Sequence, residues 1–381
     1  MAYLDHNATS PLRPQAHAAM ERALGLQANA SSVHRAGRSA RALIEEARAE
    51  VARLAGASAE QIVFTSCGSE ANALALWGAV ERTRESGPPV GYLCVSAMEH
   101  DSVLRTAAQI VDRIPGLRIV VIPVGRDGAV DIEWLRIFLD SADARTLVAV
   151  MAANNETGII QPVGEVIDMV READGLCLVD AVQSCGKFAS DFAADYLTFS
   201  AHKLGGPQGA GALVIKEGAP FRAQLVGGGQ ETYRRAGTEN VAGIAGFGAA
   251  AKVCRGDDLS RLSRLRDGFE AELRFRFPEC VIFGEDVARL PNTSNFALPG
   301  LPAETALIAL DLDGVMVSSG AACSSGKVRA SHVLEAMSVR PEIARCALRV
   351  SLGWNSDEAD MDVALVSLEK LAARMAARRA A

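Results

Sequence analysis

Between about residues 40 and 255, the hydrophobic positions of the chain alternate between a helical and a strand-like spacing. Segment 38–56 places apolar residues on one face of a helix and ends at Gly56, and segment 68–83 shows the same spacing. Short apolar runs typical of buried strands lie at 61–66, 90–98, 117–124, 146–154, 176–182, 196–203 and 211–217. This alternation predicts an α/β fold with a mostly parallel seven-stranded sheet that is flanked by helices.

The pattern changes after about residue 255. A long charged amphipathic helix is predicted over 257–277, a shorter helix over 330–337, and a further helix at the C-terminus. Strand candidates lie at 280–285, 293–299, 314–319 and 346–353. This mixture of short strands and helices predicts a second, smaller α+β domain.

Composition and charge narrow the function classes. The 381 residues carry a net charge of −7 with scattered Lys and Arg, so we expect no nucleic-acid partner. No apolar run approaches the roughly 20 residues that span a bilayer. The first residues also lack the basic start and apolar run of a secretion signal. We therefore expect a cytoplasmic protein with no membrane partner.

The eight cysteines form no CxxC or CxxH pair, which argues against a metal site or a disulfide framework. Cys94 and Cys177 lie in strand-like apolar runs and are expected in the core. Cys323 differs, because its neighbours in SSGAACSSG are only glycine, alanine and serine. It is either an inert thiol in a surface loop or a nucleophile that must move between two places.

Candidate chemistry gathers where the predicted strands end. Ligands of such sheets bind at the carboxyl ends of the strands, so side chains at these ends are expected to share one rim. The helix that begins at Gly68 and Ser69 offers free N–H groups to an anion. The other candidates at strand ends are His100, Asn155, Asp180, Ser200, His202 and Lys203.

This set of groups fits pyridoxal phosphate. The cofactor needs a lysine for a Schiff base, a carboxylate for its ring nitrogen and a cradle for its phosphate. Taken singly, Lys203 could be a solvated turn lysine and Asp180 a strand-end cap. Their joint occurrence on successive predicted strands favours the cofactor site.

Almost the whole chain resembles the cysteine desulfurases of the NifS/IscS group, which are fold-type I pyridoxal-phosphate enzymes. The segments that carry the resemblance are YLDHNATSPLRP, SSVHRAGRSAR, FTSCGSEANALAL, MEHDSV, NNETGIIQPV, VDAVQSCGK, SAHKLGGPQGAGAL, GGGQETYRRAGTENVAGIAG, SSGAACSSG and LRVSLG. The resemblance implies a large cofactor-binding domain at 15–255. It implies a small domain made of 1–14 and 256–381, which carries the Cys323 segment.

The resemblance also implies roles for single residues. Lys203 would hold the cofactor, Asp180 would pair with its ring nitrogen and Gln183 would bond its phenolic oxygen. Thr238 would reach the phosphate of the neighbouring subunit, which implies a homodimer. The whole implied cofactor set is Gly68, Ser69, His100, Asn155, Asp180, Gln183, Ser200, His202, Lys203 and Thr238.

The implied activity is the removal of sulfur from L-cysteine, which gives L-alanine and a persulfide on Cys323. Cys323, Lys203 and His100 would be catalytic, and Arg349 with Asn155 would bind the substrate. The implied partners are a sulfur acceptor or an iron–sulfur scaffold protein, with nitrogenase clusters among the destinations. No metal site is implied.

Three other functions remain as alternatives. A selenocysteine lyase would keep the fold but depend less on its own thiol. An aminotransferase would need no Cys323, and a scaffold would bind an iron–sulfur cluster through cysteines. The loop cysteine and the dispersed positions of the other thiols favour the desulfurase.

Overall fold

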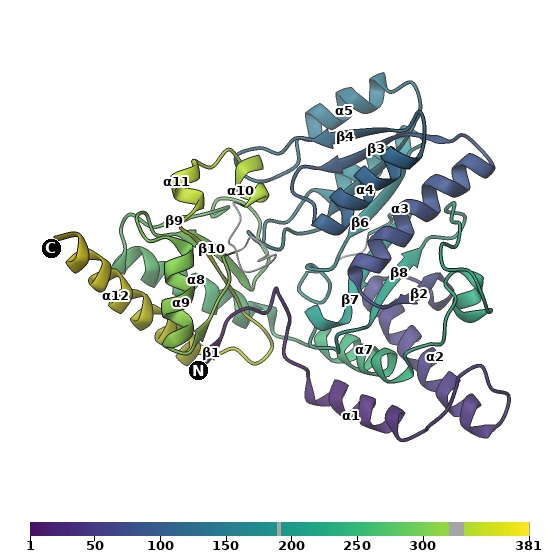
Figure 1. The fold of residues 1–381 in the computed structure, drawn as a ribbon, viewed down its shortest axis with the longest axis horizontal. Helices are drawn as coiled ribbons and strands as arrows, with labels where there is room; N and C mark the ends of the chain where they lie inside the picture. The colour runs from purple at the N-terminus through teal and green to yellow at the C-terminus, as the bar shows by residue number, and fades with distance from the viewer. Residues whose placement is uncertain (189–191, 320–330, 381) are drawn as a thin grey trace.

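The computed structural model describes residues 1–188, 192–319 and 331–380. A seven-stranded sheet in the order β2-β8-β7-β6-β5-β3-β4 forms the centre of the larger unit (Figure 1). Its strands are β2 (Ile62–Thr65), β3 (Val90–Ser96), β4 (Arg118–Ile122), β5 (Arg145–Met151), β6 (Leu176–Asp180), β7 (Tyr196–Ser200) and β8 (Gly211–Ile215). Neighbouring strands are parallel except for β8, which is antiparallel to β2 and β7. The predicted mostly parallel sheet is confirmed.

Two helical layers cover this sheet, because successive side chains of a strand point to opposite faces. On β5, Val148 and Val150 belong to one apolar cluster, whereas Leu147 and Ala149 belong to the other. Helices α2 (Arg35–Ala55), α5 (Ile132–Ser141), α6 (Val163–Glu172) and α7 (Val241–Cys254) supply the first cluster. Helices α3 (Gly68–Glu85) and α4 (Asp101–Arg113) supply the second. Helix α1 (Pro14–Leu24) packs on the outside of α7.

The smaller unit is built on an antiparallel sheet in the order β12-β10-β9. Its strands are β9 (Val281–Ile282), β10 (Thr293–Ala297) and β12 (Ala347–Ser351). One apolar cluster joins this sheet to α8 (Leu259–Arg276), α9 (Ala303–Leu312) and α12 (Glu358–Ala380). Two short helices, α10 (His332–Ala336) and α11 (Pro341–Ala344), lie on the side that faces the larger unit (Figure 1).

Two strands are shorter than the sequence predicted. Within the run at 280–285, only β9 forms a strand. Gly284 adopts a φ of 71°, in the left-handed region that glycine tolerates, and turns the chain away from the sheet. The run at 314–319 keeps only β11 (Val315–Met316), because its partner strand β1 (Ala2–Tyr3) is itself only two residues long.

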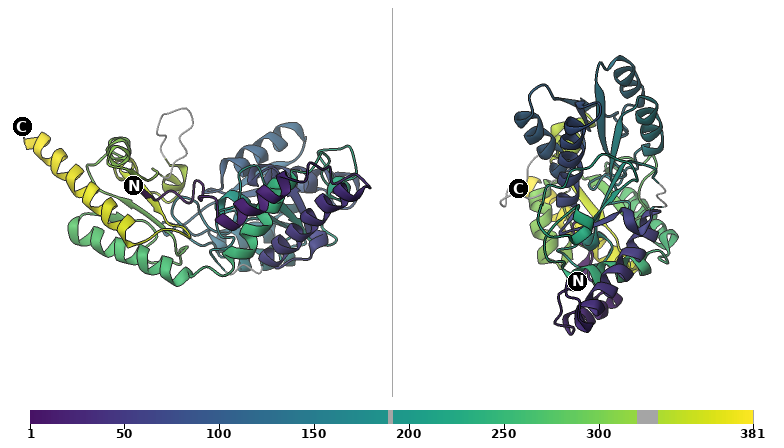
Figure 2. Two further views of the ribbon diagram at one scale, coloured as in Figure 1. Left: turned by 90° about the horizontal axis from the view of Figure 1, so that it is seen from below. Right: turned by 90° about the vertical axis from the view of Figure 1, so that its right-hand side faces the viewer.

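The first residues of the chain run between the two units (Figure 2). Strand β1 pairs with β11 of the smaller unit, and Asp5 then bridges to Ser351 on β12. The chain continues into α1, which packs on the larger unit. The division into 15–255 and 1–14 with 256–381 remains a prediction. Among the described residues, no helix is long and apolar enough to cross a membrane.

Candidate active site

A cavity of about 590 Å³ opens where the carboxyl ends of the parallel strands meet the smaller unit. The structure brings ten of the predicted site residues to its wall: Gly68, Ser69, His100, Asn155, Asp180, Gln183, Ser200, His202, Lys203 and Arg349. Thr238 is not among the lining residues, and Cys323 lies outside the described part of the chain. The shared rim expected from the strand order is therefore present.

Asp180 ends β6 with a carboxylate whose direction is fixed by two donors. Its Oδ2 accepts a hydrogen bond from Nδ2 of Asn72 at 2.8 Å, and its Oδ1 accepts one from the backbone N–H of Val182 at 3.0 Å. Asn72 is held in turn, because its Oδ1 accepts from Oγ1 of Thr198 at 2.6 Å. Asp180 thus presents an oriented acceptor to the cavity. The sequence analysis missed Asn72, whose only signal was an amide on the apolar face of α3.

Lys203 lies on the single turn Ala201–Lys203 that follows β7. Its Nζ donates to the backbone carbonyl oxygens of Asn7 at 2.5 Å and Ala8 at 2.8 Å. Burial and, to a smaller extent, the nearby charge of Arg349 lower the pKa of Lys203 to about 8, while Asp5 and Asp180 act in the opposite sense. At this pKa roughly one molecule in ten carries a neutral Lys203 amine at pH 7, far more than for an ordinary lysine, and a nucleophilic amine must be neutral.

The start of α3 forms an anion-binding site in the cavity wall. A Cβ on Gly68 would lie 2.7 Å from Cγ2 of Val182, so only glycine lets the helix start this close to the strand ends. The hydroxyl of Ser200 is buried and finds no hydrogen-bond partner among the described residues. Free N–H groups at a helix start, next to an unsatisfied hydroxyl, suit a phosphate.

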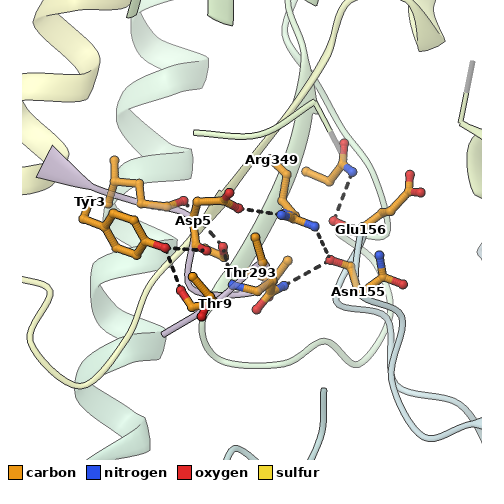
Figure 3. A network of polar contacts seen from close by, with 12 residues as sticks. Tyr3, Asp5, Thr9, Asn155, Glu156, Thr293 and Arg349 are labelled. Atoms are coloured by element: carbon orange, nitrogen blue, oxygen red, sulfur yellow. Dashed lines mark hydrogen bonds and ion pairs between the residues drawn. The ribbon is translucent and has the colours of Figure 1, made fainter. Parts of the chain in front are cut away.

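Two hydrogen-bonding partners hold the guanidinium of Arg349 on β12 (Figure 3). Its Nη2 pairs with Oδ1 of Asp5 at 2.5 Å, and its Nη1 donates to the backbone oxygen of Asn155 at 2.9 Å. Its Nε is buried and has no partner in the described structure. An oriented guanidinium with an unpaired N–H at a cavity wall is a binding group for a carboxylate.

The two predicted histidines differ in their surroundings. His100 caps α4, where its Nδ1 accepts from the backbone N–H of Ser102 at 3.1 Å and contacts the hydroxyl of Ser102 at 2.8 Å. His202 is partly covered, and its Nδ1 lies 3.2 Å from Oγ1 of Thr9. Burial, with a smaller effect of Lys203, lowers the pKa of His202 to about 4, so its ring is neutral at neutral pH.

Asn7 lines the cavity and was given no role by the sequence analysis. Its side-chain amide donates to Oγ1 of Thr293 at 2.9 Å and to the backbone oxygen of Asn155 at 3.2 Å. Its Oδ1 accepts from Asn292 at 3.1 Å and from Lys187 at 3.3 Å. Pairings across such long sequence separations leave no local pattern, so the sequence could not reveal them.

A buried acid lies behind the rim. Oε1 of Glu99 accepts from Oγ of Ser96 at 2.6 Å and from the backbone N–H of Met151 at 2.7 Å. Its Oε2 has no partner among the described residues. Burial, with a contribution from the charge of Asp180, raises the pKa of Glu99 to about 8. Within the described ranges, no three His, Cys, Asp or Glu side chains are arranged to hold a metal ion.

Comparisons with known proteins agree with this geometry. The aminotransferase class-V family profile matches residues 2–363. A cysteine desulfurase IscS from Dictyoglomus turgidum is 38% identical over 97% of this chain and 94% of its own length. An IscS-like cysteine desulfurase from Mycobacterium tuberculosis is 39% identical over 100% of this chain and 98% of its own length. A solved NifS-like protein superposes with a TM-score of 0.89 at 32% identity, covering 98% of this chain and 100% of that one.

Replacing Asn7 with Ala is expected to destabilise the fold by about 2–4 kcal/mol, because buried donors and acceptors on both units lose their partner. Urea unfolding of the purified chain measures this change. The exposed turn residue Asn29 provides a control, since Asn29→Ala should change stability by less than about 0.5 kcal/mol. Equal effects of the two substitutions would contradict the role given to Asn7.

Glu99 predicts a pH dependence of stability. Its pKa is raised from 4.5 to about 8 in the fold, so unfolding releases a proton between these values. The contribution of Glu99 to the free energy of unfolding therefore falls as the pH rises from 4.5 to about 8, by at most about 1.4 kcal/mol per pH unit. The Glu99→Gln side chain stays neutral at every pH. Its free energy of unfolding in urea, relative to that of the wild type, should therefore rise between about pH 5 and about pH 8. A constant difference at both pH values would show that Glu99 is ionised in the fold.

Proposed function

The chain belongs to the class-V aminotransferase family and, within it, to the cysteine desulfurases, and we propose how its residues carry out that reaction. L-cysteine and the thiol of Cys323 react to give L-alanine and a persulfide on Cys323. Pyridoxal 5'-phosphate is the proposed cofactor, held in the cavity at the strand ends. The observation that carries this proposal is one cavity wall that contains Lys203, Asp180 and the unsatisfied hydroxyl of Ser200.

The residues present fit the cofactor. Lys203 supplies an amine of lowered pKa for the covalent link, and Asp180 supplies an oriented carboxylate for the ring nitrogen. The start of α3 and Ser200 supply donors for the phosphate, and Gln183, which lines the same cavity, is the proposed donor to the phenolic oxygen. When bound there, the cofactor supplies an electron sink for the carbon that loses its proton.

Arg349 and Lys203 act on the substrate itself. The unpaired Nε–H of Arg349 is the proposed donor to the carboxylate of L-cysteine, while Asp5 and Asn155 hold the guanidinium in place. When its Nζ is not bonded to the cofactor, Lys203 would be the base that takes the proton from the α-carbon of L-cysteine. His100, which lines the cavity, is the proposed acceptor of the thiol proton of Cys323.

Cys323 is the proposed nucleophile. Its thiolate attacks the substrate sulfur and forms the S–S bond, while the electron pair of the C–S bond passes to carbon, which takes a proton and becomes the methyl group of alanine. Ser319, which lines the cavity, precedes Cys323 by four residues. Four residues span at most about 14 Å, so the thiol has the chain length to reach the cavity.

The remaining assignments rest on the resemblance alone. Thr238 is proposed to contact the cofactor phosphate of a second subunit in a homodimer, and Gly68, Ser69 and His202 to complete the local cradle. A sulfur acceptor or iron–sulfur scaffold is the proposed partner, and the cytoplasm the proposed compartment. The domain division is proposed with them.

Cys323→Ser should lower alanine release from L-cysteine by about two orders of magnitude or more, because the hydroxyl cannot take the sulfur. Alanine and alkylation-sensitive persulfide are both measured after cysteine is added. Cys280→Ser, at a partly exposed position away from the cavity, is the control and should keep wild-type turnover. Near-normal alanine release from Cys323→Ser would exclude the persulfide route.

Arg349→Lys should raise KM for L-cysteine by about 10- to 100-fold with a smaller change in kcat, because a compact ammonium cannot keep both internal partners and the substrate carboxylate. Steady-state kinetics check this expectation. Arg345→Lys, at an exposed position, is the matched control. An unchanged KM in Arg349→Lys would remove Arg349 from the substrate site.

A further inference from the structure

A second lysine lies beside Lys203 and has no part in the function proposed above. Lys187 belongs to the segment that follows β6, seven residues beyond Asp180. It lines a small second cavity of about 20 Å³ together with Lys203, which lines the main cavity as well. Both amines also hydrogen-bond to Asn7 of the N-terminal segment.

The contacts of Lys187 converge on two amides. Its Nζ donates to Oε1 of Gln183 at 3.2 Å and to Oδ1 of Asn7 at 3.3 Å. Nε2 of Gln183 donates to the backbone oxygen of Asn7 at 2.9 Å, the same oxygen that accepts from Lys203 at 2.5 Å. Lys187, as a donor to Oε1, and the backbone oxygen of Asn7, as an acceptor from Nε2, thus select the same orientation of the Gln183 amide.

We propose that Lys187 is a positioning residue of this site, which locks the amide of Gln183 in one orientation and holds a second amine beside Lys203. This inference rests on the proposed function, in which Gln183 donates to the phenolic oxygen of the cofactor. With Oε1 engaged by Lys187 and one N–H of Nε2 donated to Asn7, the second N–H of Nε2 is left to donate to that oxygen. A rotated amide would present an acceptor to an acceptor and lose the hydrogen bond.

The electrostatic surroundings agree with this geometry. Burial, together with the charges of Lys203 and Arg349, lowers the pKa of Lys187 to about 7, whereas Cys185 acts in the opposite sense. The charged or titratable groups around the two amines are Asp5, His6, Asp180, Cys185, His202 and Arg349. No carboxylate hydrogen-bonds to Lys187 among the described residues, so its proton is held only by neutral amides.

The first test uses the visible absorption band of the full chain with bound pyridoxal 5'-phosphate. Lys187→Met removes both a positive charge and the constraint on Gln183, and both losses favour the protonated form of the link to Lys203. The pH midpoint of the band should rise by on the order of one unit. Lys216→Met, on a lysine that lines neither of these two cavities, should leave the midpoint unchanged. A midpoint in Lys187→Met within about 0.2 units of wild type overturns the inference.

A second measurement needs neither a folded Lys187 variant nor the cofactor. Trace acetylation of the full chain across a pH series, followed by peptide mass spectrometry, reports the titration of the Lys187 amine. The midpoint should lie near 7 in the wild type and rise in Lys203→Met, because the neighbouring positive charge is gone. A wild-type midpoint near the ordinary lysine value of about 10.4 overturns the inference. A wild-type chain that forms no visible band at all would instead overturn the proposed function, and the acetylation series still decides the role of Lys187.

Discussion

The hydrogen bonds of Asn7 are the constraint on which the site depends. Its backbone N–H donates a hydrogen bond to Oγ of Ser351 at 2.9 Å. Its backbone oxygen accepts hydrogen bonds from the side chains of Gln183 and Lys203. Its side-chain amide forms four more hydrogen bonds, with Thr293, Asn292, Asn155 and Lys187. One residue near the N-terminus therefore ties β12 and β10 of the smaller unit to the strand ends of the larger one. Because buried polar groups must be paired, this arrangement fixes how the two units meet over the cavity.

Charge balance around the cavity follows from the same arrangement. Three cationic side chains, Lys187, Lys203 and Arg349, lie close enough to affect one another, and two carboxylates, Asp5 and Asp180, partly offset them. Burial removes water that would otherwise screen these charges, so the amines are held in a weakly basic state. A cavity of this kind favours anionic groups such as a phosphate and a carboxylate.

Much of this could be predicted from the sequence, and the exceptions have a physical cause. Buried parallel strands appear in the sequence as continuous apolar runs, and polar groups such as Asp180 and Lys203 follow these runs directly. The sheet and the set of side chains at its edge could therefore be predicted. Asn7, Asn72 and Asp5 received no role from the sequence, because each works through partners far away in the chain. The two-residue strands β9 and β11 were overestimated, since apolar runs do not record where a glycine turn or a short partner ends the pairing.

The central claim is that the amine of Lys203, and no other, holds the cofactor in this cavity. The most direct measurement is borohydride reduction of the full chain with bound pyridoxal 5'-phosphate, followed by peptide mass spectrometry. The account predicts a phosphopyridoxyl group on the peptide that contains Lys203. The same group on the neighbouring Lys187, or no modified lysine, would contradict it.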